Sequence, residues 1–128
     1  NAFTDYMTAM KMPKKTDDEK NLRKEKMQEG LKKAINVPLS VMRISDSCWE
    51  WMVEVARVGN ISSKSDLEVG AKSLQTGIWG ASKNVEINLP QIEDEKYKNE
   101  VMKESEEILK RADTSLNEVL SILAGRTP

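Results

Sequence analysis

The sequence predicts an all-α fold, and three observations support this. Proline and glycine are sparse, at 4 and 6 residues in 128, while 32% of the residues are charged. This composition is typical of helical proteins. Apolar residues recur every three or four positions, as they do on one face of a helix, and residues that cap helices lie between these periodic segments. We therefore expect an irregular antiparallel helical bundle with a long Pro-kinked helix and a central helix rich in small residues.

Length and charge limit the possible classes of protein. A chain of 128 residues corresponds to one domain, residues 1–128, with room for a core that needs no disulfides. The formal charge is −1, from 20 basic and 21 acidic residues, which argues against a nucleic-acid-binding domain. No apolar run approaches the roughly 18 residues of a membrane span, and we see no secretory signal.

Histidine is absent and Cys48 is the only cysteine. No Ser-His-Asp or Cys-His catalytic arrangement can be built from these residues, nor can a histidine-ligated or thiolate-cluster metal site. One cysteine excludes an intrachain disulfide and fits a reducing compartment. Any catalysis must use carboxylates, lysines, hydroxyls, backbone amides or water.

The first ten residues predict an amphipathic helix, because Phe3, Tyr6, Met7 and Met10 follow helical spacing. They have no evident cap, so we expect them to belong to a longer helix. Pro13 ends this helix within a basic loop, Lys11 to Lys15.

A second helix begins at Thr16, which starts a capping-box pattern ending at Glu19. Its helical pattern continues to Gly59. Pro38 lies inside the pattern and predicts a kink or break near Asn36. The core candidates are Leu22, Leu31, Ala34, Ile35, Leu39, Met42 and Val53.

Trp49 and Trp51 cannot share one helix face, because residues two apart point in different directions. One of the two is expected in the core, and the other at the surface or at an interface. Stacking of either ring on a cofactor is the alternative.

The central helix is expected to start between Ser62 and Ser65 and to stop at Pro90. One face is apolar and a second row is small: Gly70, Ser73, Gly77 and Gly80. Glycine costs a helix roughly 1 kcal/mol against alanine. We expect the row to allow close approach of another backbone, which would make this helix buried; the alternative is a helix of poor propensity at a hinge.

A final helix is expected from a cap at Asp94 to Gly125, with a seam close to a heptad repeat and exposed pairs Glu106–Lys110 and Glu107–Arg111. The segment 93–113 is locally acidic, whereas 11–33 is locally basic. Two interpretations remain open. In the first, the two segments are solvated faces whose opposite charges help helices or subunits dock. In the second, the basic segment attracts the anionic tail of a ligand. The seam residues are Val101, Ser105, Ile108, Ala112, Leu116, Val119 and Leu123.

Three ordered blocks resemble the formimidoyltetrahydrofolate cyclodeaminase family, which is related to a methenyltetrahydrofolate cyclohydrolase. The blocks are AFTDYMTAMKMPK, MQEGLKKAINVPL and GNISSKSDLEVGAKSLQTGIWGASKNVEINL. The resemblance covers nearly the whole chain. Its most specific part is Ser65-Asp66 followed by Asn84-x-x-x-Asn88.

The resemblance implies an all-helical, cytoplasmic lyase of one-carbon folate metabolism and histidine degradation, forming a homodimer or a larger oligomer. It implies that 5-formimidoyltetrahydrofolate loses ammonia to give 5,10-methenyltetrahydrofolate near the subunit interface, with no metal and no cofactor beyond the folate substrate. Family members also carry an N-terminal triple-glycine-serine segment that is missing here. The family's catalytic aspartate would align just before Asn1, so the chain resembles the C-terminal part of the domain, and the role does not pass to Asp5.

The resemblance also suggests site residues in this chain. Asp66 is the candidate catalytic carboxylate, since cyclisation needs a proton delivered to the departing amine. The alternative is that it only stabilises the helix start. Lys14 and Lys15 are candidates for binding a polyglutamate tail, or are ordinary surface lysines. The candidate pterin ligands, which in the alternative interpretation only satisfy helix ends, are Asn60, Ser65, Asn84 and Asn88.

Two function classes therefore remain. The first is a folate enzyme, with the cyclodeaminase ahead of the cyclohydrolase. The second is a non-catalytic helical dimer that serves as a scaffold, which the seam of the final helix would support.

Overall fold

The computed structural model of the protein describes residues 1–127, and this part of the chain contains helices and no strands. The all-α prediction is therefore confirmed. None of these helices is long and apolar enough to cross a membrane. The helices are α1 (Ala2–Met10), α2 (Asp17–Asp46), α3 (Trp49–Val58), α4 (Lys64–Glu86) and α5 (Glu95–Ala124), with short 3-10 helices η1 (Ile61–Ser63) and η2 (Leu89–Gln91).

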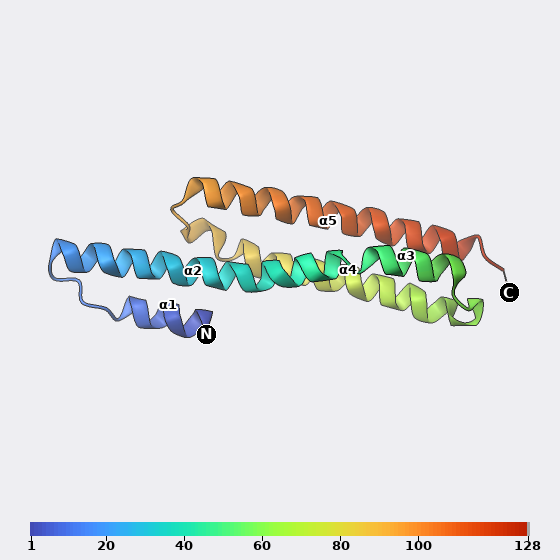
Figure 1. Cartoon of the computed structure of the whole chain (residues 1–128), viewed down its shortest axis with the longest axis horizontal. Coiled ribbons are helices and arrows are strands. Elements are labelled where there is room, and N and C mark those ends of the chain that lie inside the picture. Colours follow the sequence, from blue (N-terminus) through green and yellow to red (C-terminus); the bar gives the residue numbers. More distant parts are fainter. Residues whose placement is uncertain (128) are drawn as a thin grey trace.

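The helices form an elongated antiparallel bundle (Figure 1). Helices α2 and α3 follow one another along the long axis, α4 returns beside them, and α5 runs back in the direction of α2. Helix α1 folds back along the N-terminal half of α2, so the N-terminus lies beside the middle of α2.

The predicted helix ends are confirmed except at the first helix, which was expected to lack a cap: the Asn1 side chain caps α1 by accepting a hydrogen bond from the Thr4 amide at 3.0 Å. The Thr16 side chain accepts a hydrogen bond from the Glu19 amide while the Glu19 carboxylate accepts one from the Thr16 amide, which completes the capping box. Asp94 caps α5 by accepting from the amide of Tyr97 at 3.0 Å. Gly59 and Gly125 end α3 and α5, as expected.

Of the predicted kink or break near Asn36, the break is wrong, whereas the kink stays a prediction. Helix α2 continues through Pro38 to Asp46, and the chain leaves the helix only at Ser47 and Cys48. Proline removes its own amide from the helix ladder, but the residues on both sides of Pro38 remain helical from Asp17 to Asp46.

The core runs along the middle of the bundle. From α2 it takes Leu31, Ile35, Leu39 and Met42, as predicted, but Leu22 is 48% exposed because it lies beyond the reach of α4 and α5. Ala34 and Val53 are only partly buried. The predicted seam of α5 is confirmed, with Leu116 its one partly buried member and the other six buried.

The two tryptophans separate as predicted: Trp49 is 4% exposed and packs in the core, whereas Trp51 is 71% exposed.

The central helix is not surrounded by the rest of residues 1–127, contrary to expectation. Within this range a Cβ placed on Gly77 or Gly80 would meet nothing within 4 Å, and one on Gly70 would meet only the Met52 side chain. Close approach of two backbones occurs instead at Gly30, where a Cβ would stand 3.0 Å from the Cα of Tyr6. The row of small residues on α4 therefore faces outward.

Ion pairs join α2 and α3 to α5. Lys32 pairs with Asp94, Arg43 with Glu104, Asp46 with Arg111, and Arg57 with Glu118. The basic segment contacts the acidic one through Lys32–Asp94 and through Lys24–Glu93 at 2.8 Å, which supports the helix-docking interpretation of the uneven charge. The expected local pair Glu107–Arg111 does not form between these two described residues, because the Arg111 guanidinium binds Asp46 at 2.8 Å instead.

Candidate functional site

The groove between α2 and α4 has the size and lining of a small-molecule site. Its volume is about 720 Å³, within the range usual for ligand pockets. Its walls are mostly apolar, with two amide side chains at one end. We call it the α2–α4 groove; its lining is Asn1, Ala2, Phe3, Ala34, Val37, Pro38, Val41, Gly77, Ala81, Asn84 and Asn88.

Asn84 and Asn88 stand one turn apart on the last part of α4 and at its C-cap region. The amide nitrogen of Asn84 donates to the carbonyl of Gly80, and that of Asn88 to the carbonyl of Asn84, each at 3.2 Å. These bonds fix both amides along the helix and leave their carbonyl oxygens available to a ligand donor. The structure thus brings these two predicted site residues together.

The other predicted polar group lies at the opposite end of α4. Asn60 accepts a hydrogen bond from the amide of Ser62 at 3.0 Å and so stabilises η1. Ser65 and Asp66 are exposed in the first turn of α4. Asp66 and Asn84 are about 27 Å apart along the helix axis, so one chain does not bring these two groups to one site.

Lys14 and Lys15 lie in the loop between α1 and α2, exposed to solvent. The backbone amide of Lys15 donates to the Glu19 carboxylate at 2.8 Å, which orders the loop. Helix α1 separates this loop from Asn1, and hence from the α2–α4 groove, by about 13 Å.

The carboxylate of Asp5 lies close to the groove, one helical turn beyond its lining residue Ala2. It pairs with the Lys33 ammonium at 3.0 Å, and this hydrogen bond and charge hold the pKa of Asp5 below its ordinary value of 3.8. A group with a lowered pKa is ionised at neutral pH and is a poor proton donor. Asp5 is therefore held in an ion pair with Lys33 and is not proposed as the acid.

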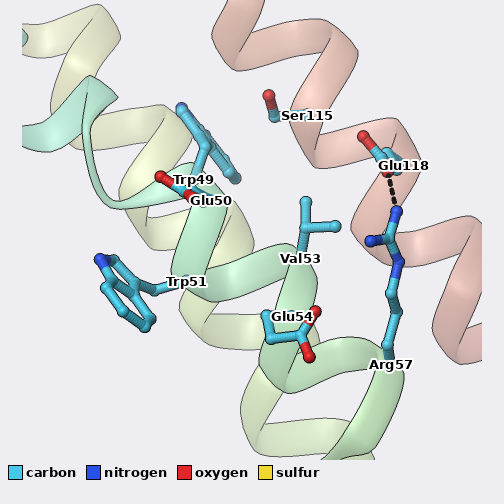
Figure 2. A pocket seen from close by; sticks show the side chains of 8 residues that line it. All are labelled: Trp49, Glu50, Trp51, Val53, Glu54, Arg57, Ser115 and Glu118. Carbon is cyan, nitrogen blue, oxygen red and sulfur yellow. Dashed lines mark hydrogen bonds and ion pairs between the residues drawn. The ribbon is translucent and has the colours of Figure 1, made fainter.

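A second pocket, of about 460 Å³, lies between α3 and α5 (Figure 2). Arg57 contacts Glu118 at 3.0 Å across it, and Glu50 and Glu54 lie on the same side of α3. Trp51 extends from α3 away from Ser115 and Glu118. Three carboxylates against one guanidinium make this pocket unfavourable for an anionic ligand.

Sequence reasoning did not single out the apolar half of the α2–α4 groove. Phe3, Val37 and Val41 are 73%, 62% and 48% exposed, although their residue types predict burial. A usable signal was available in the spacing, because the two valines are offset from the helix face that carries the core residues Ile35 and Leu39.

No group of three or more acidic or cysteine side chains within residues 1–127 is arranged to hold a metal ion.

Comparison with known proteins gives one family. The profile of the formiminotransferase-cyclodeaminase family matches residues 1–107. A formimidoyltransferase-cyclodeaminase of Dictyostelium discoideum is 50% identical over 126 residues, covering 98% of this chain and 22% of that protein. The chain therefore spans about a fifth of the length of this curated relative.

Two shorter relatives are informative. A methenyltetrahydrofolate cyclohydrolase of Methylorubrum extorquens is 38% identical, covering 91% of this chain and 56% of that protein. The crystal structure of a formiminotetrahydrofolate cyclodeaminase from Thermotoga maritima superposes with a TM-score of 0.80 at 27% identity, covering 97% of this chain and 58% of that one.

Proposed function

Because this chain belongs to the formiminotransferase-cyclodeaminase family, we propose that the intact protein converts 5-formimidoyltetrahydrofolate to 5,10-methenyltetrahydrofolate. In this reaction N10 of the folate attacks the formimidoyl carbon, a new C–N bond forms, and the terminal nitrogen leaves as ammonia once it has been protonated. The match over residues 1–107 carries this proposal.

The α2–α4 groove is the proposed folate site. A pterin is a flat ring system with hydrogen-bond donors and acceptors on its edge, and the groove offers apolar walls with the Asn84 and Asn88 amides at one end. The proposed substrate is a tetrahydrofolate polyglutamate, whose anionic tail would extend toward Lys14 and Lys15. No further cofactor and no metal are needed for this chemistry.

The proton donor comes from outside the groove lining in this proposal, because no titratable side chain of residues 1–127 lines it. We assign the role to the aspartate that the family resemblance places just before Asn1, since Asn1 and Ala2 are themselves part of the lining. Asp66 is proposed as a second site carboxylate, with Asn60 and Ser65 beside it.

A homodimer would unite the two ends of α4. Asp66, Ser73, Gly77 and Asn84 share one helix face, and Asp66 and Asn88 each lie about 16 Å from Gly77 along the axis. Two copies of α4 that cross antiparallel at Gly77 would bring Asp66 of one subunit close to Asn88 of the other. The open space around Gly77 and Gly80 supports such a crossing, in which the second α4 would form the outer wall of the α2–α4 groove that Gly77 lines. We propose this cytoplasmic homodimer as the active form, residues 1–128 supplying most of its folate-processing domain.

Subunit mixing tests this arrangement. Asp66→Ala and Asn88→Ala variants of the intact protein should each lose activity, and a mixture of the two after subunit exchange should recover about one quarter of the wild-type rate, because half of the dimers would then hold one complete site. A mixture that stays inactive, although subunit exchange is verified, would reject the shared site without rejecting the reaction.

The reaction itself is tested by ammonia release from 5-formimidoyltetrahydrofolate with the intact protein. Asn84→Ala should raise KM, whereas Asn99→Ala, at an exposed position on α5, should not. Absence of both turnover and folate binding by the wild-type protein would reject the proposal and favour a helical scaffold.

Methenyltetrahydrofolate cyclohydrolase activity is the second candidate, favoured by the similarity to the Methylorubrum extorquens enzyme. The two activities differ in the leaving group and in the use of water. Spectroscopic loss of 5,10-methenyltetrahydrofolate with the intact protein, without ammonia release from the formimidoyl substrate, would select the cyclohydrolase.

A further inference from the structure

Helix α2 and the start of α3 together carry a second apolar face that nothing in residues 1–127 covers, and its last two members, Cys48 and Trp51, lie beyond the end of α2 at Asp46. It faces away from the core positions Ile35, Leu39 and Met42. Its spacing alternates between four and three residues, as in a helix-packing seam. Four members are valine, isoleucine or tryptophan, between 48% and 71% exposed. We call it the α2 stripe; it consists of Val37, Val41, Ile44, Cys48 and Trp51.

The α2 stripe continues the surface on which α1 packs. Gly30, Val37, Ile44 and Trp51 are each seven residues apart, and seven residues return a helix to nearly the same face. At Gly30 this face meets the backbone of Tyr6 in α1. Within residues 1–127, α1 therefore packs on this face at Gly30, whereas no helix packs on it at Ile44 and Trp51.

The contacts between α1 and α2 show in which direction a helix that continues the line of α1 would run along α2. The Arg23 guanidinium donates to the Met10 carbonyl at 3.1 Å, and the Lys33 ammonium binds Asp5 at 3.0 Å. As the residue number rises along α2 it falls along α1, so the two helices are antiparallel (Figure 1). A helix in line with α1 would run directly over the α2 stripe.

We propose that, in the intact protein, a helical segment of the same polypeptide lies in line with α1 and covers the part of the α2 stripe beyond the α2–α4 groove, from Ile44 to Trp51. These residues span about 10 Å, or two turns of helix. The segment would place apolar side chains at three- and four-residue spacing against the stripe and polar ones outward. The solved relative has ample chain for it, because this chain covers 58% of that structure.

A segment of the same polypeptide fits this surface better than a second copy. Helix α1 already occupies the same face of α2 and sets the antiparallel register, so the covering helix must abut α1 end to end. A covalent continuation meets this requirement at high effective concentration, whereas a helix of another subunit would compete with α1 for the approach. This inference does not depend on the identity of the substrate.

Cys48 provides the test, because it lies inside the α2 stripe and is exposed in this chain. We would follow maleimide labelling of Cys48 in the intact protein by peptide mass spectrometry. The matched control is Lys103→Cys in a Cys48→Ser background, at an exposed position on α5. Labelling of Cys48 should be at least about tenfold slower than that of the control, at every protein concentration, because it requires local opening.

Two outcomes would overturn the proposal. Equal labelling rates would show that the stripe is bare, and protection of Cys48 that disappears on dilution would show that a second copy covers it. An independent variant is Ile44→Asp, which should accelerate Cys48 labelling about tenfold or more. Asn99→Asp, which introduces the same side chain at an exposed site on α5, should leave the rate unchanged.

Discussion

Gly30 and Tyr6 bring two helices together through their main chains: a Cβ on Gly30 would stand 3.0 Å from the Cα and 3.1 Å from the backbone nitrogen of Tyr6. Glycine normally weakens a helix, so its presence in the middle of α2 is explained by this contact. The position of α1, and with it the Asn1 wall of the α2–α4 groove, depends on it.

Gly30→Ala should therefore destabilise the packing of α1. The added methyl group gains helix propensity, worth about 1 kcal/mol, but forces α1 outward, and overpacking costs typically about 1–3 kcal/mol. We expect a net loss of about 1 kcal/mol in the free energy of unfolding and faster hydrogen exchange in α1. Unchanged exchange in α1 would show that Tyr6 shifts without cost.

Gly77→Leu tests whether the outward-facing row of small residues on α4 packs against a second subunit. Within residues 1–127 nothing lies within 4 Å of a Cβ at this position, so a single subunit should keep its helical content. The leucine should, however, block an antiparallel crossing of two α4 helices. We expect the intact protein to become monomeric in sedimentation, with unchanged far-ultraviolet circular dichroism.

The control for this experiment is Lys72→Leu, which adds the same side chain to an exposed part of α4 outside the row and should leave the dimer intact. A Gly77→Leu protein that remains dimeric with an unaltered thermal midpoint would place the row in solvent.

Acid should weaken the docking of α2 on α5. The Arg43 guanidinium binds Glu104 through two nitrogens, with Nη2 2.7 Å from Oε2, and this hydrogen bonding lowers the pKa of Glu104 from its ordinary value of 4.5. A carboxylate with a lowered folded pKa stabilises the fold fully above its unfolded pKa, and this contribution is lost as the pH falls through the folded pKa.

Glu104→Gln should remove this contribution at neutral pH, by up to about 1 kcal/mol because the pair is partly exposed to solvent. As the pH falls below 4.5 and through the lowered folded pKa of Glu104, its stability should converge with that of the wild type. Chemical denaturation at neutral and at acid pH measures both effects. A difference that stays constant across this range would mean that the variant acts through packing instead of charge.

Arg126 ties the end of the described chain to α3. Its guanidinium donates to the carbonyl of Ala56 at 2.6 Å and to that of Gly59 at 2.7 Å, both at the C-terminal end of α3. Arg126→Met should cost about 1.5–3 kcal/mol of unfolding free energy, as expected for charged hydrogen bonds. Arg126→Lys should recover only part of it, because an ammonium cannot reproduce the two-pronged geometry. Thermal unfolding of the variants measures both effects. Lys103→Met, at an exposed site, should leave the free energy of unfolding unchanged in this assay.

Local rules predicted the helices well where the decisive contacts are close in sequence. The Thr16 capping box, the Asp94 cap and the seam of α5 depend on neighbours within one or two turns, and all three are confirmed. The opposite burial of Trp49 and Trp51 follows equally from helix geometry.

Features that depend on the neighbouring helix were not predictable in this way. Leu22 has the type of a core residue, but only the arrangement of α4 and α5 leaves it outside. Arg111 has an acidic neighbour one turn away, yet its partner is Asp46 on α2.

The glycines show the same limit. A glycine in a helix indicates close packing but does not identify the partner, which explains why Gly30 was overlooked and Gly77 was expected to be buried. Of the candidate site residues, Asn84 and Asn88 line the α2–α4 groove, and their role there stays a prediction.

The ion pairs between α2 and α5 also bear on how the chain avoids misfolding. On α2 the basic Arg43 pairs with the acidic Glu104 of α5. At the next ion pair along the same two helices the charges are reversed, because the acidic Asp46 of α2 pairs with the basic Arg111 of α5. If α5 slid by two turns in one direction, Arg111 would face Arg43. A slide in the other direction would set Glu104 against Asp46. Each shifted alignment of these heptad-like helices thus brings like charges together, so the reversal penalises the alternatives that the apolar seam by itself would tolerate.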